Sequence, residues 1–121
     1  MSSQQIIVLL QEIKIAYCNY LTYAWRGKYV FTPGTGNSQG CITLTNAEIH
    51  ILHAQHFGNR GHYFLLTIPN EDPMLVTNLY APIGFDDAKI TFFNDIFELI
   101  GNYDCDIIIG GDFNVTLGAN E

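Results

Sequence analysis

The sequence predicts an α/β domain built mostly of antiparallel strands, with one clear amphipathic helix near residues 86–101. Short apolar segments separated by turn residues occupy most of the chain, which is typical of hairpins or a meander. Apolar residues at spacings of three and four mark the helix. A strand, this helix and another strand then follow in order, which predicts a βαβ unit with two parallel strands.

The composition describes a single domain, or part of one, that can build a hydrophobic core. Of the 121 residues, 48% are hydrophobic, and they include 8 Phe and 7 Tyr. The formal net charge is −7, from 12 acidic and 5 basic residues. This balance argues against a general polyanion-binding surface, but not against a metal site, where carboxylates serve as ligands.

The three cysteines, Cys18, Cys41 and Cys105, are far apart and form no Cys-x-x-Cys pair. Free thiols favour a reducing compartment, so we expect an intracellular protein of the cytoplasm or nucleus. The start Met1–Gln5 lacks the basic region of a signal peptide, and the apolar run Ile6–Leu10 is too short to span a membrane. We therefore expect no membrane partner.

The first predicted element is a buried strand over Gln5–Gln11, because Ile6–Leu10 is continuously apolar. It ends at Glu12, whose carboxylate could share a cation with a second acid on a neighbouring strand. The alternative is that Glu12 only marks the point where the strand meets water. Residues 17–31 are rich in tyrosine without a regular period, so we expect a partly buried loop with a short strand near Lys28–Thr32.

Four strands and the helix follow. The strands are predicted at Cys41–Thr45, Glu48–Leu52, Tyr63–Ile68 and Leu75–Tyr80. The helix begins at Asp86 or Asp87, both good N-caps, and ends at Gly101. Its apolar face is expected to pack in the core and consists of Ile90, Phe93, Ile96, Phe97 and Ile100.

The four histidines invite a metal-site interpretation; they are His50, His53, His56 and His62. A spacing of three places His50 and His53 on opposite faces of a strand. Nothing supplies the closed tetrahedral ligand set that zinc prefers. We therefore expect edge or loop histidines and no histidine metal site.

The stretch Asp106–Asn114 is the one most suggestive of a functional site. Its three isoleucines predict a fully buried strand, and the two glycines after them predict a sharp turn at the strand's carboxyl end. Asp112 and Asn114 follow at the position where open α/β sheets bind ligands. If the strands of the βαβ unit are neighbours, Tyr80 stands at the same rim as Asp112. The alternative is an ordinary turn rich in Asp and Asn.

Three short motifs lie at this predicted rim: Leu10-Gln11-Glu12, Asn78-Leu79-Tyr80-Ala81-Pro82 and Gly110-Gly111-Asp112-Phe113-Asn114. In this order and spacing, with the strand Gly40–Leu44 between them, they resemble the endonuclease/exonuclease/phosphatase superfamily. The nearest likeness is to the apurinic-endonuclease-like endonuclease domain of LINE-type (non-LTR) retrotransposon proteins. The resemblance covers nearly the whole chain, so residues 1–121 are expected to be a single, incomplete domain of this type.

The resemblance implies a partial two-sheet α/β sandwich of the DNase I-like kind and phosphodiester hydrolysis that depends on Mg²⁺ or Mn²⁺. Glu12 matches the family's metal-ligand glutamate, and Asp112 the acid that orients or deprotonates the attacking water. Asn114 matches the amide that holds the phosphate, and Tyr80 the tyrosine near the scissile phosphate. Oxygen ligands suit Mg²⁺, which neutralises developing charge. The implied partners are DNA and the reverse transcriptase part of a larger polyprotein.

The chain departs from the family at both ends. The family's first strand, with an Asn near the metal, has no counterpart here, and neither has its C-terminal Ser-Asp-His motif. Ile83 stands where members often have Asn. We therefore expect an interior fragment of a DNA endonuclease domain with weak or no activity. The alternatives are a phosphatase or lipid phosphodiesterase of the same superfamily, and a folded remnant without catalysis.

Overall fold

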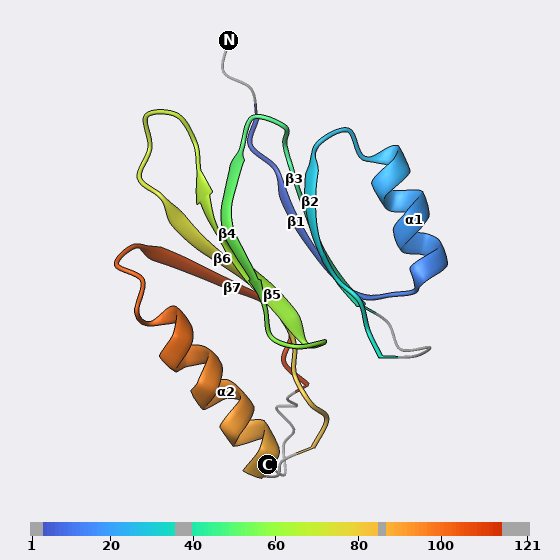
Figure 1. Ribbon diagram of the computed structural model, residues 1–121, viewed down its shortest axis with the longest axis vertical. Coiled ribbons are helices and arrows are strands. Elements are labelled where there is room, and N and C mark those ends of the chain that lie inside the picture. The colour runs from blue at the N-terminus through green and yellow to red at the C-terminus, as the bar shows by residue number, and fades with distance from the viewer. Residues whose placement is uncertain (1–3, 36–39, 85–86, 115–121) are drawn as a thin grey trace, which may run out of the picture.

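The computed structural model describes residues 4–35, 40–84 and 87–114. Over these residues the elements follow in the order β1 (Ile7–Ile13), α1 (Ile15–Ala24), β2 (Lys28–Thr32), β3 (Gly40–Thr45), β4 (His50–His56), β5 (Gly61–Thr67), β6 (Met74–Tyr80), α2 (Asp87–Ile100) and β7 (Asp106–Asp112). Figure 1 shows two sheets packed against one another, with α1 outside one sheet and α2 outside the other. The layers run helix, sheet, sheet, helix.

The first sheet has three antiparallel strands in the order β1-β3-β2, and the second has four strands in the order β4-β5-β6-β7. Within the second sheet, β4, β5 and β6 are antiparallel neighbours, whereas β6 and β7 are parallel and joined by α2. The predicted α/β sandwich of mostly antiparallel strands is confirmed, and so is its βαβ unit. The strand expected at Glu48–Leu52 begins later and extends further, as β4.

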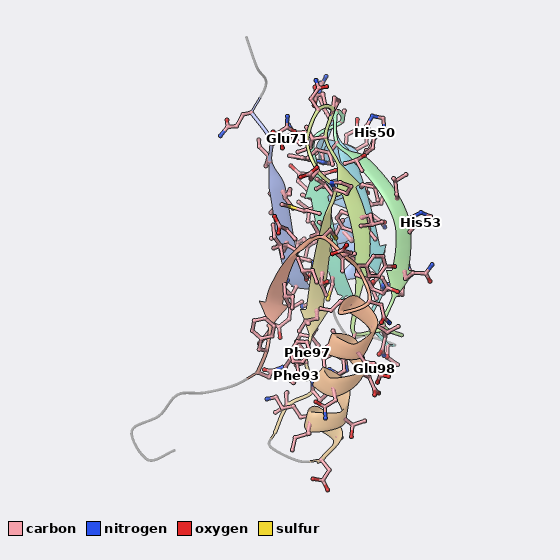
Figure 2. All side chains as sticks on the ribbon, turned by 90° about the vertical axis from the view of Figure 1, so that its left-hand side faces the viewer. His50, His53, Glu71, Phe93, Phe97 and Glu98 are labelled. Atoms are coloured by element: carbon pink, nitrogen blue, oxygen red, sulfur yellow. The ribbon has the colours of Figure 1, made fainter. Side chains whose placement is uncertain are left out.

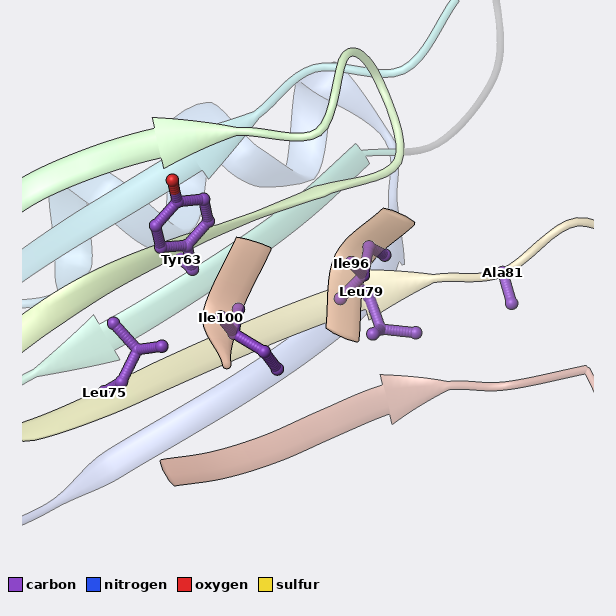
Figure 3. Packing of buried hydrophobic residues seen from close by; sticks show 6 residues of the cluster. All are labelled: Tyr63, Leu75, Leu79, Ala81, Ile96 and Ile100. Atoms are coloured by element: carbon purple, nitrogen blue, oxygen red, sulfur yellow. The ribbon is translucent and has the colours of Figure 1, made fainter. Parts of the chain in front are cut away.

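Apolar side chains form three layers of core, because residues on a strand alternate between its two faces. Phe64 and Val76 lie in the layer between the two sheets. Leu79 and Ile96 lie in the layer between the second sheet and α2, which Figure 3 shows from close by. Ile42 packs in the third layer, between the first sheet and α1. The predicted core is therefore present as three apolar layers, one between each pair of neighbouring layers of helix or sheet.

The helix α1 overturns the expectation of a loop within residues 17–31. Cys18 and Trp25, seven residues apart, lie on the same side of the helix and pack with Ile42 on the outer face of the first sheet. The tyrosines concealed this pattern because they occupy the opposite side. The short strand expected near Lys28–Thr32 is confirmed as β2.

The helix α2 confirms the helix predicted near residues 86–101, although the candidate N-cap Asp86 lies outside the described residues. Its expected apolar face is only partly buried. Ile90 and Phe97, both expected in the core, are largely exposed. They line an open apolar hollow of about 540 Å³, whose other lining residues are Phe93, Asn94, Ile109 and Phe113.

The strand β7 corrects two expectations. It lies at the edge of the second sheet, so its isoleucine run is not fully buried, and Ile107 and Ile108 are 37% and 39% exposed. The two glycines do not end the strand, which continues to Asp112. Gly111 has a φ of 136°, and a Cβ there would lie 2.0 Å from the Leu79 carbonyl oxygen. The strand β1, also expected to be buried, is likewise a half-buried edge strand.

The cysteines are free, as expected, and Cys18 and Cys41 are buried. Burial raises the pKa of the Cys41 thiol to about 11, which keeps it protonated at neutral pH. In the described parts of the chain, neither helix has the length and apolar character that a membrane crossing requires.

Candidate functional site

Three strands end at one end of the sandwich, which we call the rim (Gln11, Glu12, Tyr80, Asp112 and Asn114). β6 and β7 are parallel, so the residues at their carboxyl ends lie side by side, and Tyr80 pairs with Asp112 in the register. β1 reaches the same end from the other sheet (Figure 1), where Gln11 Nε2 donates a hydrogen bond of 2.6 Å to Asn78 Oδ1. The structure therefore brings residues from all three sequence motifs to one end.

Asp112 and Asn114 are held in place by a turn that follows β7. The Asn114 N–H donates to Asp112 Oδ1 over 2.9 Å, and Asn114 Nδ2 donates to the Ala81 carbonyl oxygen over 2.6 Å. The Ala81 N–H donates in turn to the Asp112 carbonyl oxygen over 2.8 Å. The buried Lys89 adds a hydrogen bond from Nζ to the Asn114 carbonyl oxygen. These bonds orient the carboxylate and the carboxamide beside the end of β6.

Arg60 lies beside the rim, and sequence reasoning missed it. Its guanidinium carbon lies 5.3 Å from the centroid of the Tyr80 ring, within the range of a cation–π contact. Its carbonyl oxygen accepts a 2.8 Å hydrogen bond from the Tyr80 N–H. A planar cation at this position suits a phosphate group, which guanidinium binds in bidentate fashion. Nothing in the local sequence connects a turn residue between β4 and β5 with Tyr80, so only the tertiary structure reveals the pair.

Glu12 lies at the end of β1, in a bulge where the register shifts between Leu10 and Ile13. Its φ of 58° is uncommon for a residue other than glycine, and such backbone conformations are found at ligand-binding sites. The side chain is exposed, and its neighbour Gln11 is anchored to Asn78 across the two sheets. The bulge therefore places a carboxylate at the solvent side of the rim.

The oxygen donors of the rim suit magnesium better than zinc. Within residues 4–35, 40–84 and 87–114, no three His, Cys, Asp or Glu side chains gather closely enough to hold an ion by themselves. Mg²⁺ is usually bound by one or two carboxylates together with waters and substrate phosphates, whereas zinc requires a fuller set of protein ligands. The carboxylates of the rim are Glu12 and Asp112.

A chain of polar side chains, which we call the interior relay, leads from the rim into the space between the sheets. Its first members are Gln11, Asn78 and Thr43. Asn78 is fully buried and uses its Nδ2 group to donate to Thr43 Oγ1 over 3.1 Å and to the Ile42 carbonyl oxygen over 3.2 Å. The carboxamide of Asn78 thereby ties the end of β1 to the centre of the first sheet.

The relay continues through His62, which is completely buried. Its Nε2 lies 2.7 Å from Thr43 Oγ1, and its Nδ1 lies 2.8 Å from Thr32 Oγ1. Burial, with a smaller contribution from His56, lowers the pKa of His62 to about 3, so the ring is neutral. Thr32 Oγ1 also lies 2.7 Å from Nδ1 of His56. Since the Thr32 hydroxyl has one hydrogen, it can donate to only one of the two histidine rings, and the tautomer of His62 decides which ring receives it.

The four histidines thus divide into two groups. His50, His53 and His56 lie on the edge strand β4, as expected, and Figure 2 shows His50 and His53 at its outer side. The expectation is wrong for His62, which lies on β5 inside the sandwich. Its neighbours Tyr63 and Phe64 are also buried, so this part of β5 is buried on both faces.

Comparison with solved structures identifies the fold to which this geometry belongs. D. rerio TDP2, crystallised with a single strand DNA product, matches with a TM-score of 0.73 at 16% identity over 91% of this chain and 48% of that chain. A functionally unknown conserved protein from Enterococcus faecalis matches with a TM-score of 0.73 at 15% identity, over 90% and 52%. ANGEL2, a 2′,3′-cyclic phosphatase, matches with a TM-score of 0.67 at 18% identity, over 93% and 40%.

The chain spans about half the length of these structures. No protein-family model matches the chain, and no curated protein matches it in sequence. TDP2 and ANGEL2 belong to the endonuclease/exonuclease/phosphatase superfamily. The chain therefore has the fold of that superfamily, a partial DNase I-like α/β sandwich.

Proposed function

We propose that the chain is part of a divalent-metal-dependent phosphodiester hydrolase whose active site is the rim. One observation carries the proposal: parallel strands hold Tyr80 beside Asp112 and Asn114, while β1 brings Glu12 to the same end from the other sheet. The fold supports it, because TDP2 is seen with a DNA product and ANGEL2 is a cyclic phosphatase. Both structures thus involve a phosphate ester, as a bound product in TDP2 and as the substrate class of ANGEL2.

Each rim residue has a role that suits its chemistry. Glu12 holds Mg²⁺ or Mn²⁺, and the bound cation supplies Lewis-acid stabilisation of the charge that develops on the phosphoryl oxygens. Asp112 orients the attacking water and accepts its proton. Asn114 and Tyr80 position the phosphate, and the Arg60 guanidinium beside Tyr80 neutralises part of its charge.

The finer form of the proposal is a DNA endonuclease of the LINE-type retrotransposon kind, working beside a reverse transcriptase in the parent protein. The three rim motifs support this form, together with the DNA product in TDP2. We propose that the rim alone supports weak hydrolysis at most, because only two of its residues, Glu12 and Asp112, have carboxylates, and no group of three possible ligands gathers within the described residues. Without further ligands, cation affinity at such a site is low.

The test is nicking of supercoiled plasmid by the folded chain with Mg²⁺, after circular dichroism has established folding. We expect faint nicking that chelator abolishes, and that Asp112→Asn and Glu12→Gln each reduce by at least about tenfold, since each removes a charged group from the reaction. The matched control is Asp95→Asn on α2, an exposed acid away from the rim, which should nick as the unchanged chain does. Nicking that survives both rim substitutions would overturn the proposal.

A second candidate is a phosphatase of the same fold, acting on a small phosphate ester. The net charge of −7 favours it, because a strongly acidic protein repels a polyanion, and ANGEL2 provides a phosphatase precedent for the fold. p-Nitrophenyl phosphate and bis(p-nitrophenyl) phosphate separate the two functions. Faster release from the monoester, with the plasmid left intact, would favour the phosphatase.

A further inference from the structure

The charge of the chain is distributed unevenly. All 12 acidic residues lie outside residues 13–47, whereas three of the five basic residues, Lys14, Arg26 and Lys28, lie inside this segment. The segment therefore carries +3 in a chain whose net charge is −7. In the structure its described residues form α1, β2 and β3, so three of the five basic residues lie on the elements of one side of the sandwich.

The outer face of α1 is also aromatic. Tyr17, Tyr20 and Tyr23 are 65%, 70% and 91% exposed, and their spacing of three places them on the side of the helix that faces away from the first sheet. Lys14 stands at the N-terminal end of this face and Arg26 follows its C-terminal end, both exposed. We call these five residues the α1 face. Acidic side chains are absent from this helix.

The chemistry of the α1 face differs from that of an ordinary solvated helix surface. The three tyrosine rings are exposed to water and therefore lack the burial that normally stabilises aromatic side chains. Within the described part of the chain, no residue of the face forms an ion pair. Aromatic rings beside cations are the surface on which single-stranded nucleic acid binds, with bases stacked on the rings and phosphates near the cations. A duplex fits poorly, because its base faces are already stacked and two cations offer few phosphate contacts.

We propose that the α1 face binds single-stranded nucleic acid. Bases stack on the three tyrosines, and Lys14 and Arg26 contact the phosphates at either end. The composition argues against a general polyanion-binding surface, and a local positive face is compatible with that result because all 12 acidic residues lie outside residues 13–47. The face begins two residues after Glu12, so a bound strand can lead towards the rim. The binding itself needs neither a metal ion nor hydrolysis, so it is independent of the proposed function.

The experiment is fluorescence anisotropy of a labelled oligothymidylate, titrated with the folded chain in chelator so that hydrolysis is absent. Tyr20→Leu and Tyr23→Leu should each weaken binding by roughly fivefold or more, because leucine keeps apolar area but removes the stacking ring. Tyr20→Phe and Tyr23→Phe should bind within about twofold of the unchanged chain, since phenylalanine still stacks. The matched control is Phe97→Leu, an exposed aromatic on the acidic helix α2, which should bind unchanged.

Salt provides a second readout. Replacing Lys14 or Arg26 with Gln should make the plot of log affinity against log salt concentration shallower by about 0.7 per lost phosphate contact. Circular dichroism of each variant separates loss of binding from loss of folding.

The proposal is overturned if the folded chain fails to bind the oligonucleotide, if the leucine variants bind as well as the phenylalanine variants, or if a duplex of the same length binds equally. Binding to anionic phospholipid vesicles but not to the oligonucleotide would also overturn it, and would identify the face as a membrane contact. Binding without any plasmid nicking would leave this inference intact while removing support for hydrolysis at the rim.

Discussion

The strands β3 and β7 show how differently two apolar segments can be used. β3 lies between β1 and β2, with α1 over one face and the second sheet over the other, and all of its residues are buried. β7 has the more continuous apolar run, yet it is an edge strand and leaves Ile107 and Ile108 partly exposed. The burial of a strand therefore depends on how many of its faces and edges other elements cover. The hydrophobicity of the strand alone does not predict this coverage.

The contrast extends to the surfaces beside the two strands. Beside β7, the open hollow under α2 is lined almost entirely by apolar side chains. An uncovered edge strand next to an apolar surface is a typical site of association with another strand. β3 has no such liability, because both of its edges are paired.

The largest expected effect comes from truncating the same residue type in the two strands. Ile42→Ala in β3 should lower the free energy of unfolding by about 2–5 kcal/mol, because it leaves a cavity in a fully buried layer. Ile108→Ala in β7 should cost less than about 1 kcal/mol, since the side chain is already partly in water. Urea unfolding followed by circular dichroism measures both. Equal losses would show that β7 is as well covered as β3.

The second expected effect is acid sensitivity, which arises from His62 next to β3. The pKa of His62 is about 3 in the folded chain and about 6.5 when unfolded, so the unfolded chain binds the proton first as pH falls. The contribution of neutral His62 to the free energy of unfolding should therefore be fully present above about pH 6.5 and be lost progressively as the pH falls towards 3. The loss should be about 2 kcal/mol at pH 5. Denaturant titrations at several pH values measure this slope.

His62→Gln should flatten that pH profile, because glutamine does not titrate. His53→Gln, on the exposed side of β4, should leave the slope unchanged and serves as the matched control. A slope that persists in His62→Gln would assign the acid sensitivity to other groups.

A third effect is expected at the backbone of β7. Gly111→Ala should destabilise the chain by about 1–3 kcal/mol, because its φ of 136° disfavours any side chain and the new Cβ would meet the Leu79 carbonyl oxygen. Gly58 also has a positive φ, but no atom lies within 4 Å of its Cβ position, so Gly58→Ala should cost less. Thermal unfolding of the two variants compares them. An unchanged melting temperature for Gly111→Ala would contradict this prediction and would mean that the backbone at the end of β7 shifts at little cost.

Sequence patterns predicted the parts of the fold that depend on neighbours along the chain. Short apolar segments bounded by turn residues identified the strands, spacings of three and four identified α2, and the order of elements paired Tyr80 with Asp112. α1 was missed because its tyrosines hide the spacing between Cys18 and Trp25. Edge positions were not predictable, because pairing partners are chosen by the tertiary structure.

The candidate site was predictable to a similar extent. The resemblance named Glu12, Tyr80, Asp112 and Asn114, and their roles at the rim stay predictions until the nicking variants are measured. Arg60 and the link between Gln11 and Asn78 depend on side chains that meet across strands or sheets. No local pattern encodes such contacts.

The interior relay has a consequence for the tautomers of the histidine rings. Thr32 has one hydroxyl hydrogen and lies within hydrogen-bond distance of Nδ1 of both His62 and His56, so it can donate to only one of the two rings at a time. When His62 carries its hydrogen on Nε2, Thr32 donates to His62, and His56 has to donate to Thr32. The tautomer of a histidine on the edge strand β4 is thus tied to the tautomer of a histidine in the interior of the sandwich.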